Sequence, residues 1–514
     1  MTRTFVVGLD GASWRLLDPW IEEGELPNIA SLRDSGVWAE HKSCLPPVTF
    51  PNWKCYSSGK DPGGFGVFWF ERVDLEEGEI TTTNSEDFRT AELWDYLNTD
   101  GFSTGVVNMP TMFPPRELDG VLVCGGPATV EGEYRSIDTG YTYPEDIATY
   151  LNNEFSYRVH PEPLISSNDE RGAEVEAILS ILESRFEVAL DLFEREELDF
   201  MHVTLFYLNV LHHFFWDEEP TQQAWQLVDE WIGRLSELED TNLILMSDHG
   251  SAPTTTEFYI NEWLAENGYQ ARQRTVEDFL RPLGLNRENV LQLAKRAGVV
   301  DLLARTVPER LQQLIPQSAG IKRGRKLEAI NLDETKAVAS AQGPIYLNPV
   351  FDVETVREEL IDDLRGVSDS TGKLFTSIHH GEDAYTGPFV DEGPEVVVDQ
   401  RPGVHVNDGI GGGTIQSGPD RWAAENTPHG IFVANGPDFD DRGEIESISI
   451  LDIAPTLLAA VGSDIPTDMQ GSVLPVFETE PSWDTREPIA VSEKGEQNRS
   501  DQVTDRLKQL GYME

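Results

Sequence analysis

Two acidic residues, one histidine and one threonine stand where the chain could bring them together around a divalent metal ion. Asp10 and the pair Asp248–His249 each follow an apolar run of strand length, and glycine comes directly after each of them. Thr49 lies in a third segment far from both. Catalytic groups in open α/β sheets gather at the carboxyl ends of strands, so we expect Asp10, Asp248 and His249 to converge there. Two carboxylates, an imidazole and a hydroxyl are a suitable ligand set for a catalytic divalent metal.

Thr49 has the residue type and the setting of a nucleophile in phosphoryl transfer. Pro51 follows it by two residues, and a proline in the first turn is typical of a helix start, where free backbone N–H groups favour an anion. A threonine hydroxyl is a weak nucleophile unless a divalent cation helps it to ionise. Taken alone, such a threonine is usually an ordinary helix cap. The catalytic interpretation therefore depends on Asp10 and Asp248–His249, and it adds Asn52 and Lys54 as predicted substrate contacts.

A second group of candidate ligands follows the strand predicted at 198–205. Asn209 and His213 are four residues apart, so they would share one face of a helical turn. Histidines among aromatic residues usually belong to the core, but a place at the carboxyl end of a strand favours a metal ligand. His429 opens another apolar strand and is the best remaining histidine for this site. We expect the other histidines of loop-like segments at the surface: His379, His380 and His405.

Strand and helix patterns alternate along the chain and indicate an α/β fold with a mostly parallel central sheet flanked by helices. A broad apolar face on the long helix predicted from 172 to 196 is typical of core packing. The predicted strands are 4–10, 103–108, 119–124, 198–205, 241–247, 394–398 and 430–434. The predicted helices are 26–35, 91–99, 144–153, 172–196, 219–236, 353–365 and 449–461.

The chain is strongly acidic. It has 514 residues with 91 Asp plus Glu against 39 Lys plus Arg, a formal charge of -52 and a pI near 4.4. This charge argues against nucleic acid and anionic membranes as partners. The acidic residues are spread along the whole chain, which favours a protein of a salt-loaded cytoplasm, where screening shortens their repulsion. A moderately acidic protein of an ordinary cytoplasm is the alternative. No run of about 18 apolar residues exists, and the first residues lead straight into a strand, so we expect neither a membrane span nor a signal peptide.

Composition divides the chain into three parts. We expect a catalytic domain over 1–475, a small helical insertion over 268–332 within it, and a polar tail over 476–514. The insertion gathers basic residues that are scarce elsewhere, and it would lie over the active edge of the sheet. These residues either steer an anionic substrate or form a solvated face that balances charge. They are Arg281, Arg287, Lys295, Arg296, Arg305, Arg310, Lys322, Arg323, Arg325 and Lys326.

The motifs, taken together, resemble the alkaline phosphatase superfamily, and specifically its type I phosphodiesterase/nucleotide pyrophosphatase-like branch. Their order and spacing extend over roughly residues 4 to 475. The matching segments are VVGLDG at 6–11, PPVTFPNW at 46–53, SGKDP at 58–62, SDHG at 247–250, NGP at 435–437 and LDIAPTLL at 451–458.

The resemblance implies a site with two metal ions, usually zinc and sometimes manganese, and a threonine that attacks phosphorus. By motif, Asp10, Thr49, Asp248 and His249 would hold one ion. The resemblance implies that the second ion takes an aspartate, a histidine four residues later and a third histidine near the final strands. This sequence has Asn209 in place of the aspartate, His213 at the matching histidine, and either His429 or Asn426 at the third position.

The asparagine leaves two classes of function open. An amide removes a full negative charge from the ligand set and suits zinc poorly, so the second ion would be weak, different or absent. The first hypothesis is a hydrolase of small phosphodiesters or phosphomonoesters, such as a nucleotide or a sugar nucleotide. The second is a catalytically weakened member of the superfamily that binds a phosphorylated ligand. Transfer to an acceptor other than water is a further variant, and the oligomeric state stays undetermined.

Overall fold

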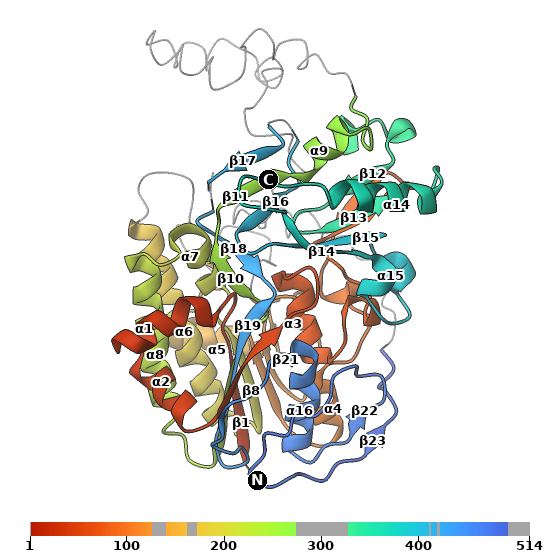
Figure 1. The fold of residues 1–514 in the computed structure, drawn as a ribbon. Helices are drawn as coiled ribbons and strands as arrows, with labels where there is room; N and C mark the ends of the chain where they lie inside the picture. The colour runs from red at the N-terminus through yellow and green to blue at the C-terminus, as the bar shows by residue number, and fades with distance from the viewer. Residues whose placement is uncertain are drawn as a thin grey trace, which may run out of the picture.

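A central mixed sheet forms the body of the molecule (Figure 1). The computed structural model describes residues 2–125, 140–161, 172–273, 327–410, 413–418 and 422–491. Within these residues the strand order is β20-β2-β19-β9-β1-β8-β5-β6-β7, with β21 also pairing to β2. The strands are β1 Arg3–Gly8, β2 Val37–Lys42, β5 Thr104–Val107, β6 Gly120–Val123, β7 Thr142–Tyr143, β8 Phe200–Thr204, β9 Thr241–Met246, β19 His429–Asn435, β20 Gly443–Glu444 and β21 Ile448–Ser449.

The centre of this sheet is parallel, which confirms the predicted fold class. Strands β9, β1, β8, β5 and β6 run in the same direction, whereas β19 is antiparallel to both β9 and β2. Every residue of β8 and β9 is buried. Because helices cover both faces of the sheet, the sequences of these strands are continuous apolar runs and do not alternate between apolar and polar residues.

Helices pack against both faces of the sheet, with one layer of helices on each face (Figure 1). One layer contains α1 Trp14–Glu23, α2 Pro27–Asp34, α5 Asp146–Phe155, α6 Gly172–Arg195, α7 Tyr207–Phe215 and α8 Glu219–Leu235. The other contains α3 Thr49–Ser58, α4 Leu93–Thr99 and α16 Ile453–Ala460. The long helix α6 buries Ile178, Leu182 and Phe186 as its apolar face predicted. All seven predicted helices are present, and none of their ends differs from the predicted residue by more than four positions.

A second, smaller region has its own sheets and its own hydrophobic cluster, and lies beyond the carboxyl ends of the central strands (Figure 1). The strand predicted at 394–398 belongs to this region and not to the central sheet. One sheet has the order β12-β13-β15-β14, and the other has the order β16-β11-β17. The elements are β11 Thr256–Tyr259, α9 Ile260–Glu266, β12 Ala337–Ala339, β13 Pro344–Leu347, α14 Val353–Leu364, β14 Phe375–His380, α15 Gly381–Ala384, β15 Val396–Gln400, β16 Val404–Asn407 and β17 Ile415–Ser417.

Short strand pairs complete the described part of the chain. The antiparallel pair β10 Gly250–Pro253 and β18 Ala424–Thr427 follows the end of β9 closely and leads toward the second region. The pair β3 Glu71–Asp74 with β4 Glu79–Thr82 is antiparallel, and the pair β22 Ile465–Pro466 with β23 Thr485–Arg486 is parallel.

The predicted insertion and its basic cluster fall largely outside the described residues, which resume at Leu327 after Gln273. The chain on the two sides of that segment is paired, because Arg272 forms an antiparallel bridge with Ile330. The first part of the predicted tail packs against the domain: Phe477 stacks on Phe439, and Arg486 pairs with Asp100. No helix within the described ranges is long and apolar enough to cross a membrane.

Candidate active site

The register of two neighbouring strands brings the two predicted carboxylates together. In the parallel pair β1–β9, Gly8 lies opposite Met246. Asp10 and Asp248 each come two residues after these partners, so they leave the same edge of the sheet side by side. Gly11 turns the chain away with a φ of 70°, and a side chain there would collide with the amide of Asn209. The turn therefore requires glycine, as the sequence has it.

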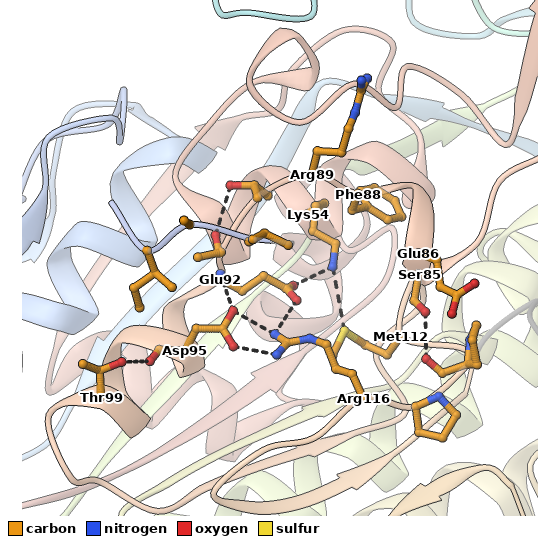
Figure 2. A pocket seen from close by; sticks show the side chains of 17 residues that line it. Lys54, Ser85, Glu86, Phe88, Arg89, Glu92, Asp95, Thr99, Met112 and Arg116 are labelled. Carbon is orange, nitrogen blue, oxygen red and sulfur yellow. Dashed lines mark hydrogen bonds and ion pairs between the residues drawn. The ribbon is translucent and has the colours of Figure 1, made fainter. Parts of the chain in front are cut away.

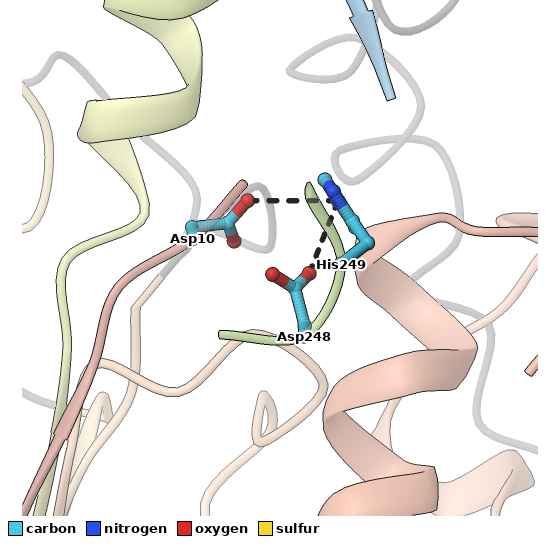
Figure 3. Close-up of side chains that lie close together, drawn as sticks. All are labelled: Asp10, Asp248 and His249. Carbon is cyan, nitrogen blue, oxygen red and sulfur yellow. Dashed lines mark ion pairs between the residues drawn. The ribbon is translucent and has the colours of Figure 1, made fainter. Parts of the chain in front are cut away.

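Asp10, Asp248 and His249 form one buried cluster at this edge (Figure 3). His249 Nε2 lies 3.2 Å from Asp248 Oδ2 and 3.8 Å from Asp10 Oδ1, and all three side chains are inaccessible to solvent. The backbone N–H of Gly11 donates to Asp248 Oδ1 at 3.2 Å, and Trp53 Nε1 donates to Asp10 Oδ2 at 3.0 Å. These bonds fix one oxygen of each carboxylate and leave the other oxygens directed into the cluster.

Burial controls the charges in the cluster. It raises the pKa of Asp10 well above its usual range, and the neighbouring charge of Asp248 raises that pKa further. It also raises the pKa of Asp248 to about 8 and lowers the pKa of His249 to about 3. Without a cation, burial thus favours the protonated form of the carboxyls and the neutral form of the imidazole. A divalent cation would reverse the first effect, because it favours the ionised carboxylates.

The donor set fits a divalent metal. Asp10 Oδ1 and Asp248 Oδ2 are buried and have no hydrogen-bond partner in the described part of the chain. Such oxygens are rare in folded proteins unless a ligand uses them. His249 Nδ1 lies 3.0 Å from the carbonyl of Gly250, which can only accept, so Nδ1 carries the proton and Nε2 presents its lone pair to the cluster. Two carboxylate oxygens and one imidazole nitrogen suit zinc or manganese.

Thr49 stands beside this cluster at the first residue of α3. Its Oγ1 lies 3.3 Å from His249 Nε2, and the side chain is fully buried. The structure therefore brings Thr49 together with Asp10, Asp248 and His249, as the sequence predicted. The position at the helix start also places the hydroxyl next to the unpaired backbone N–H groups of the first helical turn.

Asn52 holds the loop that leads to Thr49. Its Oδ1 accepts from the backbone N–H of Cys44 at 2.9 Å, and its Nδ2 donates to the carbonyls of Pro46 and Val48 at 2.9 and 3.1 Å. We predicted Asn52 as a substrate contact, but both the oxygen and the nitrogen of its amide form hydrogen bonds to the backbone of the preceding loop. The residue acts on the site through the loop that it fixes.

Lys54, the other predicted substrate contact, points into a different pocket of about 400 Å³ (Figure 2). Its Nζ pairs with Glu92 at 2.7 Å, and both side chains are 3% exposed. Burial lowers the pKa of Lys54, whereas Lys54 and Arg116 hold the pKa of Glu92 below its usual value against the opposite effect of burial. Arg116 also binds Asp95 through both carboxylate oxygens. The lysine thus belongs to a closed charge network.

Asn209 and His213 share one face of α7, as predicted, and both are buried. Asn209 lies against Gly11, and its amide lowers the pKa of Asp10 slightly against the larger effect of burial. Its Nδ2 also lies 3.3 Å from Asn426 Oδ1. His213 Nδ1 donates to the carbonyl of Ala424 at 2.9 Å. Asn209 thus adjoins the Asp10 cluster, with His213 one helical turn further along α7.

His429 is not part of the site, which corrects its prediction as a ligand. Its side chain is 47% exposed and pairs with Glu40 on the neighbouring strand β2 at 2.8 Å. Side chains alternate across a strand, and a side chain at Gly430 would touch His41 and Ser247 in the interior. His429 therefore faces outward. Asn426, the other candidate for the third position, is buried on β18 and contacts Asn209.

Several site residues had no recognisable signal in the sequence. Trp53 anchors Asp10, but a tryptophan in a helix ordinarily indicates core packing. His405, expected at the surface, is 12% exposed and pairs with the fully buried Glu425. Trp422 stacks on His213 with ring centres 3.8 Å apart. These contacts join segments that are far apart in the sequence, so local patterns could not reveal them.

Several solved structures share this fold. One is the phosphonoacetate hydrolase from Sinorhizobium meliloti 1021 in complex with phosphonoformate, at a TM-score of 0.54 and 15% identity over 85% of this chain and 90% of that one. Another is human ectonucleotide pyrophosphatase / phosphodiesterase 5, at 0.53 and 12% over 93% and 100%. An inactive form of its murine counterpart in complex with AMP matches at 0.53 and 11% over 90% and 96%.

At these identities the structural likeness establishes the fold alone. No curated protein sequence matches the chain. A family model, described as type I phosphodiesterase / nucleotide pyrophosphatase, matches residues 4–430, which is most of the chain. The protein therefore belongs to the type I phosphodiesterase / nucleotide pyrophosphatase family of phosphoester hydrolases.

Proposed function

We propose that the protein hydrolyses phosphate esters of small molecules and that Thr49 is its nucleophile. One observation carries the proposal: a threonine at the start of a helix lies 3.3 Å from His249 Nε2, beside two buried carboxylates whose oxygens fit a divalent metal. Hydrolysis of a phosphate ester requires a nucleophile, neutralised phosphoryl oxygens and help for the leaving oxygen. The cluster supplies the first two requirements at one place.

The residues of the chain would divide the work as follows. Asp10, Asp248 and His249 would hold the metal, and Asn52 keeps the loop before Thr49 in place. When bound, a zinc or manganese ion supplies charge that favours the ionised Thr49 hydroxyl and offsets the phosphoryl oxygens. Thr49 Oγ1 would form a bond to phosphorus as the bond to the leaving oxygen breaks, and that oxygen takes up a proton. Water would then release phosphate or its ester from Thr49 and return a proton to the threonine.

The substrate class follows from charge. A formal charge of -52 disfavours a polynucleotide, whereas a small anionic ester enters a site that a cation neutralises. A nucleotide or a sugar nucleotide fits this description, and AMP is the ligand in the murine relative described above. Diesters are our first choice, with monoesters and transfer to another acceptor as variants of the same chemistry. The acidic composition suggests a cytoplasm rich in salt as the setting.

A second function is favoured by one specific observation. Asn209 and Asn426 place two neutral amides beside the cluster, and their contact distance is 3.3 Å. A chain with a reduced ligand set could retain phosphorylated ligands without turnover. Such a binding protein would need the same pocket but not the hydroxyl of Thr49.

Turnover of bis-p-nitrophenyl phosphate tests the proposal and separates the two functions. The assay is run with added zinc or manganese in about 1 M KCl, where screening is strong. Thr49→Ala should lower kcat/KM by about 10³-fold or more, since the nucleophile is lost. Thr49→Ser is the matched control and should keep measurable turnover. Acid quenching followed by mass spectrometry should locate a phosphoryl adduct on Thr49. Equal turnover by wild type and Thr49→Ala would refute the proposal, and ligand binding without turnover in both would favour the binding protein.

A further inference from the structure

We infer that this chain binds one divalent metal ion in its active site, and that protein groups fill the position where related sites hold a second ion. The inference rests on the proposed function, because it describes the same site. It concerns the space beside Asp10 that is bounded by Asn209, His213 and Asn426. The groups around this space are a poor ligand set for a cation, in contrast to Asp10, Asp248 and His249.

The side chains at the second position are mostly neutral amides. Asn209 Nδ2 and Asn426 Oδ1 lie 3.3 Å apart, within hydrogen-bond reach of each other. Amides bind zinc and manganese weakly, and the oxygen of Asn426 already accepts a hydrogen bond from Asn209. Throughout the ranges that the structure describes, the cluster of Asp10, Asp248 and His249 is the group of three His, Cys, Asp or Glu side chains close enough to share a metal.

Packing also occupies the surroundings of His213. Trp422 covers its ring at 3.8 Å between centroids with an angle of 21° between the planes. The imidazole is held from the other side, because Nδ1 donates to the carbonyl of Ala424. Trp422 itself is 5% exposed. The stacked indole holds the imidazole in a packed core contact, and among the described residues His213 belongs to no group of three His, Cys, Asp or Glu side chains that could share a metal.

The carboxylate on the same strand as Asn426 is already neutralised. Glu425 is fully buried and pairs with His405, and its other oxygen accepts from Gln342 Nε2. His405 and the neighbouring Trp422 have ring centres 5.1 Å apart, so this ion pair adjoins the covered His213. The pair balances its own charge and does not supply the negative charge that a second cation would require.

The charge balance of the site explains why a neutral amide at position 209 is favourable. Asn209 lies against the turn at Gly11, the residue after Asp10, and its amide adds no charge there. One dication is balanced by two carboxylates, those of Asp10 and Asp248. An aspartate at position 209 would add a third buried carboxylate in contact with them, which is unfavourable without a second cation. The neutral pair Asn209–Asn426 therefore matches a site with a single ion.

Metal content measured on the whole chain tests the inference independently of activity. The protein is loaded with excess zinc in about 1 M KCl, dialysed, and assayed by elemental analysis. Wild type should retain about one zinc ion per chain. The double variant Asn209→Asp/Asn426→His should retain about two, because it adds a carboxylate and an imidazole next to His213. If the double variant fails to fold, the wild-type value still decides the question.

His213→Ala provides the matched control. In wild type it should leave the zinc content unchanged, since His213 holds no ion there, whereas in the double variant it should remove about one zinc ion. About two ions in wild type, or loss of an ion from wild-type protein on His213→Ala, would overturn the inference while the proposed hydrolase could stand. One ion without turnover or a Thr49 adduct would support the inference and refute the function. A wild-type protein without zinc would overturn both.

Discussion

The two buried carboxylates make a quantitative prediction about the metal-free protein. We expect Asp248→Asn to stabilise the folded protein when no metal is present. The folded chain keeps a proton on Asp248 up to about pH 8, whereas an unfolded aspartate loses it near its reference pKa of 3.8. Unfolding therefore releases a proton between these values, and the free energy of unfolding falls as pH rises through this window. The asparagine has no proton to release, so the variant escapes this loss.

The size of the effect follows from the same pKa difference. Each pH unit above the unfolded pKa removes about 1.4 kcal/mol until the folded carboxyl also ionises. At pH 7 the variant should therefore be more stable by up to about 4 kcal/mol, and at pH 4 the difference should nearly vanish. The amide can still accept the hydrogen bond that Gly11 donates to Asp248, so little else is lost.

Urea unfolding of metal-free protein at pH 4, 5.5 and 7 measures this difference. Asp369→Asn is an opposite-sign control. Despite burial, hydrogen bonds from Thr256 and Thr371 and the charge of Arg401 hold the pKa of Asp369 below its usual value. Its ionised form therefore stabilises the fold above the unfolded pKa, and its loss should destabilise the protein at pH 7. If Asp248→Asn were no more stable than wild type at pH 7, or if its advantage did not change with pH, the electrostatic account of the cluster would be wrong.

Four other changes have defined outcomes. Asn52→Ala should cost about 2–3 kcal/mol in urea unfolding and lower kcat while metal content is retained, because buried loop groups lose their partners; an unchanged kcat would contradict the positioning role. Lys54→Met should cost about 1–3 kcal/mol, since Glu92 would keep only Arg116, and unaltered stability would show that the network contributes little. His429→Ala should change stability by less than about 0.5 kcal/mol and leave zinc content intact, and lost zinc would restore His429 as a ligand. Lowering KCl from about 1 M to about 0.1 M should lower the melting temperature, because the screening length grows from about 3 to about 10 Å; a constant melting temperature would argue against adaptation to salt.

The sequence allowed the prediction of those features that strand ends determine. Asp10 and Asp248 converge because each follows a buried apolar strand of the same sheet. Thr49 could be added to the site because Pro51 indicates that a helix begins there, and α3 does begin at Thr49. These signals are local, and the parallel sheet converts them into spatial proximity. The same reasoning could not give Trp53, whose hydrogen bond to Asp10 depends on how α3 packs over β1.

The incorrect predictions concern residues whose position depends on contacts with other strands and loops. The prediction of His429 as a metal ligand was wrong. Side chains alternate between the two faces of a strand, and here Gly430 faces the interior, so His429 faces the surface. Asn52 has the residue type for a substrate contact, yet its partners are carbonyls of the preceding loop. The antiparallel strand at 396–400 has the same apolar composition as a central strand. Its place in a separate sheet follows from pairing with distant partners.

The neighbouring positions of β1 and β9 in the sheet have a consequence for the topology of the whole chain. Asp248 accepts a hydrogen bond from Gly11, which lies 237 residues earlier in the sequence. An ion bound by both Asp10 and Asp248 would thus cross-link two distant parts of the chain and close a very long loop. The loss of chain entropy on closing a loop grows with the length of the loop. Chelation should then inactivate the site and also raise the rate of global unfolding, because the ion would no longer add a link between the first strand and the middle of the polypeptide.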